Sequence, residues 1–164
     1  DLHSFPTRRS SDLLSSIHAA QARQTFIFRN WEVETTGNPL AHALLRGYVG
    51  DDGVNYPNYH FEYLERLAEI YDPAAYENPA VIIDCNHDNS GKRPGEQGRI
   101  AMEVLDSVRR SSDIARLFRG LMVESYLVGG SQDVGGGVYG QSITDACLGW
   151  DDTVKLVRSI AERL

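Results

Sequence analysis

The stretch AVIIDCNHDNSGKR at residues 80–93 decides the fold of this chain. It begins with an apolar run without alternation at residues 80–83, which favours a strand covered on both faces. A polar cluster at residues 84–90 follows, and then a basic turn, Gly91-Lys92-Arg93, that leads into a helical pattern. Parallel α/β enzymes place ligands and phosphate binders at the carboxyl ends of buried strands in this way. A polar turn that only caps the next helix fits equally well, so this stretch alone leaves both interpretations open.

Composition limits the classes of protein that the chain can be. With 164 residues, 41% of them hydrophobic and 24% charged, it has the size and composition of one globular domain or of part of a larger one. A formal charge of −7 argues against non-specific nucleic-acid binding, although a local basic cluster could still hold a small anion. Two cysteines make no disulfide framework. Since no apolar run of membrane-spanning length and no signal peptide are apparent, we expect a cytoplasmic enzyme or binding domain.

The first part of the chain does not have the pattern of the rest. Residues 1–13, DLHSFPTRRSSDL, show no periodicity, and they resemble a translated sequencing artefact at the start of a truncated gene model. We therefore expect a non-native tail at 1–13 and the folded part at 14–164, without the N-terminal half of the original protein. Residues 14–23 look like the end of a helix, and residues 25–35 predict a β-hairpin.

Short strands then alternate with helices. The expected strands are 41–45, 80–83 and 121–123, and the expected helices are 60–71, 96–110 and a last one from Trp150, with Val154, Leu156, Val157 and Ile160 facing inward. This βαβαβα order predicts an α/β fold with a parallel sheet. Three such units cannot close a barrel, so the chain is either a small open sheet or a piece of an eight-unit barrel.

Polar residues follow each of these strands. Because the carboxyl ends of parallel strands face the same side, Arg46, His87 and Glu124 should meet there, and Asp145 can reach the same place from the following loop. An imidazole and two carboxylates suit a divalent metal such as Mn, Fe or Zn. The set falls short of a full coordination shell, which leaves the open position that Lewis-acid catalysis requires. Ordinary polar strand ends remain the alternative.

Basic and glycine-rich segments allow a phosphate site but no nucleotide loop. Arg46 can grip phosphate or carboxylate with two hydrogen bonds, or it can form a structural salt bridge. Lys92 and Arg93 can add to an anion site or be solvated. The glycine-rich loop at 129–140 lacks the P-loop pattern and is interpreted as a lid or crossover loop. Cys85 has no base paired with it in the sequence, which disfavours a nucleophilic role.

Five motifs, in order along the chain, resemble those of the class I DAHP synthases. They are Gly37-Asn38-Pro39 with Leu45-Arg46-Gly47; Pro57-Asn58-Tyr59; Ile83-Asp84 with His87-Asp88-Asn89-Ser90; Met122-Val123-Glu124-Ser125; and the run QSITDACLGW at residues 141–150. The last motif is long and specific. The resemblance extends from about residue 14 to the C-terminus.

The resemblance implies an eight-unit (β/α) TIM barrel, of which this chain holds the last three strands and their helices behind the hairpin. It implies condensation of phosphoenolpyruvate with erythrose 4-phosphate to give 3-deoxy-D-arabino-heptulosonate 7-phosphate and phosphate, the first step of the shikimate pathway. By the family pattern His87, Glu124 and Asp145 ligate a divalent metal (Mn, Fe, Co or Zn), which polarises the sugar aldehyde. Arg46 holds the phosphate of phosphoenolpyruvate, Asp145 also contacts substrate, and His87 and Asp145 are the catalytic residues.

The chain also departs from the family pattern. The family's cysteine ligand and most of its substrate-binding Arg and Lys residues belong to the absent N-terminal half, so we expect this polypeptide alone to be inactive. Tyr48 replaces a common glycine, and Cys85-Asn86 stand where Phe-Ser is common. The hairpin at residues 26–35 resembles a segment that helps to bind an aromatic amino acid as feedback inhibitor. The full-length enzyme is expected to be a homo-oligomer.

Two other functions remain open at this point. The sister enzyme condenses phosphoenolpyruvate with arabinose 5-phosphate in the same type of barrel, although the run at residues 142–147 favours the heptulosonate enzyme. The fragment could also be a non-catalytic module that binds a metal or an anion. Neither a nucleic-acid partner nor a membrane is expected.

Overall fold

The computed structural model describes the backbone of residues 5–164 and the side chains from residue 12 onward. Helix α1 (Phe5–Gln21) begins inside the segment that was expected to be an aperiodic tail, and it buries Leu14 and Ile17 against the core. The helix ends at Gln21, two residues before the end of the predicted segment 14–23. Residues 1–4 of the expected tail lie outside the described residues, and the non-native origin of 1–13 stays a prediction.

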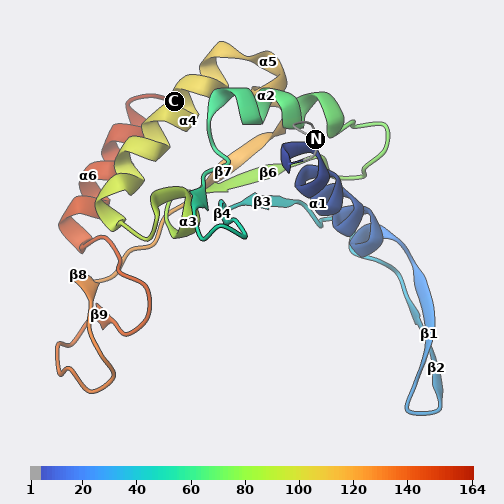
Figure 1. Cartoon of the computed structure of the whole chain (residues 1–164), viewed down its shortest axis with the longest axis horizontal. Helices are drawn as coiled ribbons and strands as arrows, with labels where there is room; N and C mark the ends of the chain where they lie inside the picture. Colours follow the sequence, from blue (N-terminus) through green and yellow to red (C-terminus); the bar gives the residue numbers. More distant parts are fainter. Residues whose placement is uncertain (1–4) are drawn as a thin grey trace.

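A three-stranded parallel sheet forms the centre of the molecule, as the alternating pattern predicted. Its strands are β3 (Ala43–Leu45), β6 (Val81–Asp84) and β7 (Phe118–Met122), in the order β3-β6-β7. Both pairs are parallel, and Leu45, Ile83 and Leu121 lie side by side across the sheet. All three carboxyl ends therefore reach the same edge, from which the loops that carry the candidate site emerge (Figure 1).

Helices cover one face of this sheet (Figure 1). They are α2 (Phe61–Ile70), α4 (Gln97–Arg110), α5 (Ser112–Leu117) and α6 (Trp150–Ala161). The strand residues that point toward the helices, such as Leu45 and Ile83, are almost fully buried, whereas Leu44 and Ile82 on the opposite side are only half-buried. The period-two alternation of a strand thus places one apolar face under the helices and leaves the other without a layer.

The helical patterns were mostly predicted correctly, with two differences. Helix α4 buries Ile100 and Val104 completely, at the expected spacing. The sequence analysis missed α5, which starts where the Ser111 hydroxyl accepts a hydrogen bond from the Ile114 backbone N–H. In α6 the expected inward position of Val157 was wrong: its side chain is 59% exposed. Helix α6 lies beside α4 at the end of the helical layer, so only a narrow strip of its surface is covered by other elements (Figure 1).

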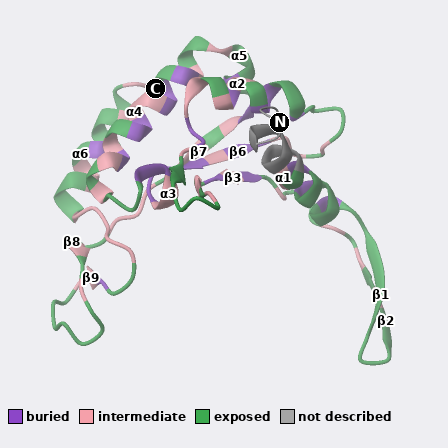
Figure 2. Cartoon of the chain, viewed as in Figure 1, coloured by how far each residue is buried: buried purple, intermediate pink, exposed green. Residues whose placement is uncertain are grey.

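Two arms extend from the body and are largely exposed (Figure 2). One is the predicted hairpin, with β1 (Gln24–Phe28) antiparallel to β2 (Trp31–Thr35). Its turn has positive φ at Arg29 and Asn30, 49° and 66°, as a tight two-residue hairpin turn requires. The other arm holds the glycine-rich loop between the short parallel strands β8 (Val128–Ser131) and β9 (Gln141–Ser142).

Short elements shape the carboxyl edge of the sheet. Strands β4 (Tyr48–Val49) and β5 (Asn55–Tyr56) form a small hairpin beside the one-turn helix α3 (His87–Ser90), and the 3-10 turn η1 (Pro94–Glu96) leads into α4. Within the part of the chain that the structure describes, no helix has both the length and the apolar character needed to cross a membrane.

Candidate metal centre

His87 is positioned directly after the central strand. Its backbone has φ of +32°, at the first residue of the short helix α3. The Asp84 carboxylate, fully buried at the end of β6, lies 2.6 Å from Nδ1 of His87. Since an ionised carboxylate can only accept, Nδ1 carries the hydrogen and donates it to Asp84. This contact orients the ring, and in the neutral imidazole it leaves the lone pair on Nε2.

Two carboxylates meet the other nitrogen of this ring. Nε2 of His87 lies 3.1 Å from Oε1 of Glu124 and 3.6 Å from Oδ2 of Asp145. One ligand atom from each of the three residues lies within 4.8 Å of the others. Residues that are far apart in the sequence are therefore brought together at the carboxyl edge of the sheet, as expected from the parallel topology.

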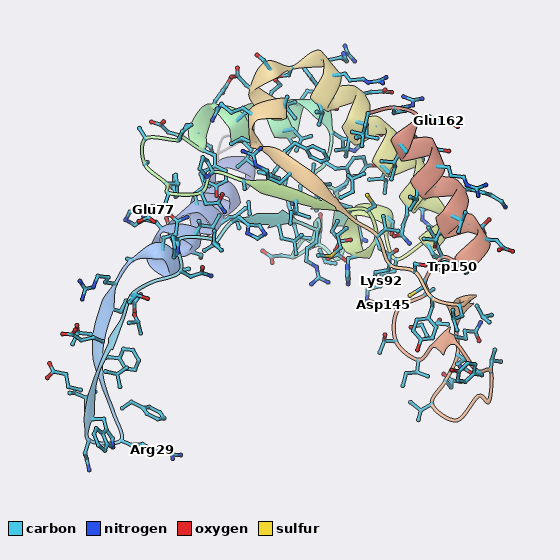
Figure 3. The ribbon with its side chains drawn as sticks, turned by 180° about the vertical axis from the view of Figure 1, so that it is seen from behind. Arg29, Glu77, Lys92, Asp145, Trp150 and Glu162 are labelled. Carbon is cyan, nitrogen blue, oxygen red and sulfur yellow. The ribbon has the colours of Figure 1, made fainter. Side chains whose placement is uncertain are left out.

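The second oxygen of each carboxylate has a partner outside this trio. Oε2 of Glu124 accepts a hydrogen bond from the side-chain amide of Asn86 at 2.6 Å. Oδ1 of Asp145 accepts from the ammonium group of Lys92 at 2.9 Å, and the two side chains lie next to each other in Figure 3. This hydrogen bond is the main cause that lowers the pKa of Asp145 and raises the pKa of Lys92. Both charges are thereby favoured near neutral pH.

Buried amides fix the backbone around the trio. Gln97, fully buried at the start of α4, donates to the Glu124 carbonyl at 3.0 Å and accepts from the Glu124 backbone N–H at 2.8 Å. Asn89 donates to the carbonyl oxygens of Leu45 and Asp84, and it therefore ties the ends of β3 and β6 to helix α3. The backbone at Glu124 and the turn that carries His87 are therefore both held by buried amides, which limits how far these two side chains can move apart.

The donor set fits a divalent cation. With the hydrogen on Nδ1, a neutral His87 presents the Nε2 lone pair to two carboxylates, an arrangement that is repulsive unless positive charge lies between them. One imidazole nitrogen and two carboxylate oxygens are ligands that Mn, Fe, Co and Zn accept. A proton on Nε2 would meet the same need, so the geometry shows competence for a metal and leaves its identity open.

Arg46 lies at the same edge with its side chain exposed. Its backbone carbonyl accepts from the Asn89 N–H at 3.1 Å, which fixes the end of β3 against helix α3. The charge of its guanidinium adds a small part to the lowering of the pKa of Asp145 and partly opposes the rise in the pKa of Lys92, so Arg46 lies within electrostatic range of the trio. An exposed guanidinium next to a metal-competent cluster can bind an anionic group of a ligand.

The other residues that the sequence analysis considered differ in whether they contact the cluster. Of the basic pair, Lys92 joins the trio, whereas Nε of Arg93 donates to the Ser90 carbonyl at 3.0 Å. Cys85 is fully buried, and burial raises the pKa of its thiol to about 12, which agrees with the interpretation that it is not a nucleophile. Cys147 is half-buried, with its Sγ 3.4 Å from the Asp145 carbonyl.

Sequence reasoning missed three supporting residues. The spacing of Asp84 and His87 at the end of a buried strand was a usable signal, because it lets a carboxylate reach the ring that follows it. Asn86 and Gln97 offered none, since their partner Glu124 is distant in the sequence and only the fold brings it near.

The sheet is parallel, and the cluster of His87, Glu124 and Asp145 lies at the edge where its strands end. The chain is therefore an α/β protein with a metal-competent site at its strand ends. The family follows from comparison: the chain belongs to the DAHP synthetase I family, whose family model matches residues 9–158.

Relatives and solved structures agree with this assignment. The chain is 36% identical to a phospho-2-dehydro-3-deoxyheptonate aldolase of Haemophilus influenzae, over 91% of this chain and 41% of that protein. It is 33% identical to a Trp-sensitive enzyme of the same name from Shigella flexneri, over 90% of this chain and 42% of that one. The structure of the Francisella tularensis enzyme aligns with a TM-score of 0.75 at 30% identity, over 92% of this chain and 43% of the other. The chain therefore spans about two-fifths of the length of these relatives.

Proposed function

We propose that this chain is the part of a DAHP synthase that carries most of the metal site and one phosphate-binding residue. The whole enzyme would condense phosphoenolpyruvate with erythrose 4-phosphate and water, giving 3-deoxy-D-arabino-heptulosonate 7-phosphate and phosphate. The observation that carries the proposal is the convergence of His87, Glu124 and Asp145 within 4.8 Å in a member of this family. In the complete protein, β3, β6 and β7 would belong to an eight-unit barrel.

Each residue of the site has a proposed role that its contacts or its place at the strand ends support. Asp84 keeps the hydrogen of His87 on Nδ1, so that Nε2 is free to act as a ligand together with Glu124 and Asp145. A divalent metal held there would supply Lewis-acid polarisation of a substrate carbonyl. Arg46, exposed at the same edge, would grip the phosphate of phosphoenolpyruvate. Asp145, whose side chain is 29% exposed, would also contact the second substrate.

Metal binding is tested by calorimetry of the 164-residue chain with Mn²⁺. We expect His87→Ala to weaken binding at least tenfold, because it removes the one nitrogen ligand. His42→Ala is the matched control, since His42 is exposed and its Nδ1 contacts the Leu40 carbonyl rather than the cluster. An unchanged affinity of the His87 variant would remove His87 from the ligand set.

Catalysis by the isolated chain is a separate question. Because the chain covers only 41% of its Haemophilus relative, we propose that other substrate-binding residues belong to the remainder and that residues 1–164 alone form no product. The assay supplies both substrates and Mn²⁺ and follows the loss of phosphoenolpyruvate. Turnover by the purified chain that disappears in Asp145→Ala would refute this expectation.

Regulation and assembly stay predictions. The Shigella relative is named as Trp-sensitive, which supports regulation of the whole enzyme by an aromatic amino acid. A role for the hairpin β1–β2 in binding that amino acid rests on the resemblance of its sequence alone. The homo-oligomeric state and the cytoplasmic location expected from the sequence also stay predictions.

A further inference from the structure

The two carboxylates of the metal centre are each held by one donor from outside. Glu124 directs Oε1 toward Nε2 of His87 and binds Asn86 through Oε2. Asp145 directs Oδ2 toward the same nitrogen and binds Lys92 through Oδ1. Each carboxylate therefore has one oxygen facing inward and one oxygen already engaged.

Asn86 is itself held firmly in place. Its side chain is fully buried, its Oδ1 accepts from the Ser90 hydroxyl at 3.1 Å, and its backbone N–H donates to Oδ1 of Asp84 at 2.8 Å. The amide nitrogen also lies 3.4 Å from the Ala146 carbonyl. Rotation of the amide would break contacts at both of its ends, so the donor to Glu124 is fixed.

The backbone directs Lys92 toward the cluster. Its φ is +58°, in the left-handed region that residues other than glycine rarely adopt, and its N–H donates to the His87 carbonyl at 2.8 Å. The same turn sends the neighbouring Arg93 back to the Ser90 carbonyl. The ammonium group of Lys92 therefore lies at Asp145, although its side chain is 58% exposed.

We propose that Asn86 and Lys92 are positioning residues that restrict Glu124 and Asp145 to one metal-facing oxygen each, and that this restriction makes the centre prefer Mn²⁺ to Ca²⁺. The inference rests on the metal binding proposed above. Ca²⁺ takes about six to eight oxygen ligands and commonly uses both oxygens of a carboxylate. Mn²⁺ accepts an imidazole and needs fewer ligands, so singly bound carboxylates penalise it less.

The charge of Lys92 does not bias the comparison of Ca²⁺ with Mn²⁺. An ammonium near the centre repels every divalent cation by a similar amount, so that removing it alters both affinities in the same direction. The ratio of the dissociation constants for Ca²⁺ and Mn²⁺ cancels this contribution and reports the ligand geometry.

The experiment measures Mn²⁺ binding to the 164-residue chain by electron paramagnetic resonance, with Ca²⁺ as competitor. We expect the Ca²⁺/Mn²⁺ ratio of dissociation constants to fall about tenfold in Asn86→Ala and in Lys92→Met, because the freed carboxylates can then bind Ca²⁺ through both oxygens. Lys92→Arg keeps a donor and should retain the ratio. Lys155→Met is the matched control, since Lys155 pairs with Asp152 at the same 2.9 Å but on helix α6.

Asn86→Leu guards against misfolding, because it nearly keeps the volume of the side chain without adding a charge and removes the donor to Glu124; its Ca²⁺/Mn²⁺ ratio should fall as in the Ala variant. Circular dichroism confirms that each variant is folded. An unchanged ratio in folded Asn86 and Lys92 variants that bind Mn²⁺ overturns this inference and leaves the metal site standing. A wild-type chain that binds no Mn²⁺ overturns both.

Discussion

At the scale of single residues, Gly47 lies where the loop after β3 touches the turn that carries His87. Its φ is +73°, and a Cβ at this position would lie 2.7 Å from the Asn89 backbone nitrogen and 2.7 Å from the Asp88 carbonyl carbon. Both neighbours are backbone atoms, which cannot move aside without moving helix α3. The glycine therefore allows the close approach on which the position of His87 depends.

Gly47→Ala should consequently cost more stability than the left-handed backbone alone explains. Gly53→Ala is the control, because Gly53 has φ of +75° and no atom within 4 Å of the added Cβ. We expect about 1–2 kcal/mol for the control and clearly more for Gly47→Ala, measured by urea unfolding. Equal losses in the two variants would show that the contact with α3 is unimportant.

The two cysteines should differ in reactivity because their burial and the pKa values of their thiols differ. Cys85 is fully buried with its pKa raised to about 12, whereas Cys147 is half-buried and has its pKa raised less. We expect iodoacetamide near pH 8 to label Cys147 first and Cys85 only after unfolding, as peptide mass spectrometry would show. Rapid labelling of Cys85 in the folded chain would contradict its burial.

At the scale of elements, helices α4 and α6 have similar sequence patterns but different surroundings. Helix α4 packs against the sheet and buries Ile100 and Val104 completely. Helix α6 packs beside α4, and Leu156 is its only buried residue. A periodic apolar face shows that a helix can be buried on one side, but the neighbours that the fold supplies determine how much of that face is covered.

The difference predicts unequal costs of truncation. Ile100→Ala should destabilise the chain by about 2–5 kcal/mol, since it opens a cavity in the core. Val157→Ala should change stability by no more than about 0.5 kcal/mol, because this side chain is already 59% exposed. Thermal unfolding of both variants checks the comparison, and a large loss in the Val157 variant would mean that α6 has a partner not seen in this structure.

At the scale of the whole molecule, the sheet is open on two sides. Among the described residues, strands β3 and β7 are its edges, and each is paired only with β6. The helices cover one face, while the two arms extend past the other (Figures 1 and 2). The hairpin arm also exposes large apolar side chains, among them Trp31 at 75% exposure. Open edges and exposed apolar surface favour association with other chains.

We therefore expect the 164-residue chain to self-associate. Sedimentation velocity over a wide range of concentration should show mass increasing with concentration, and Trp31→Lys, which places a charge on the exposed hairpin, should reduce it. A monomer at every concentration with a sharp cooperative melt would contradict this expectation.

The sequence by itself determined the main alternation of strands and helices apart from α5, the hairpin, the parallel sheet and the four candidate residues Arg46, His87, Glu124 and Asp145. These follow from local periodicity and from the rule that parallel strands end on one side. The supporting contacts were decided only by the tertiary structure. Asn86 reaches Glu124, Lys92 separates from Arg93 to meet Asp145, and Val157 loses its expected cover. Such contacts depend on where distant segments lie within a few ångströms of each other, and no local pattern of residue types encodes that distance.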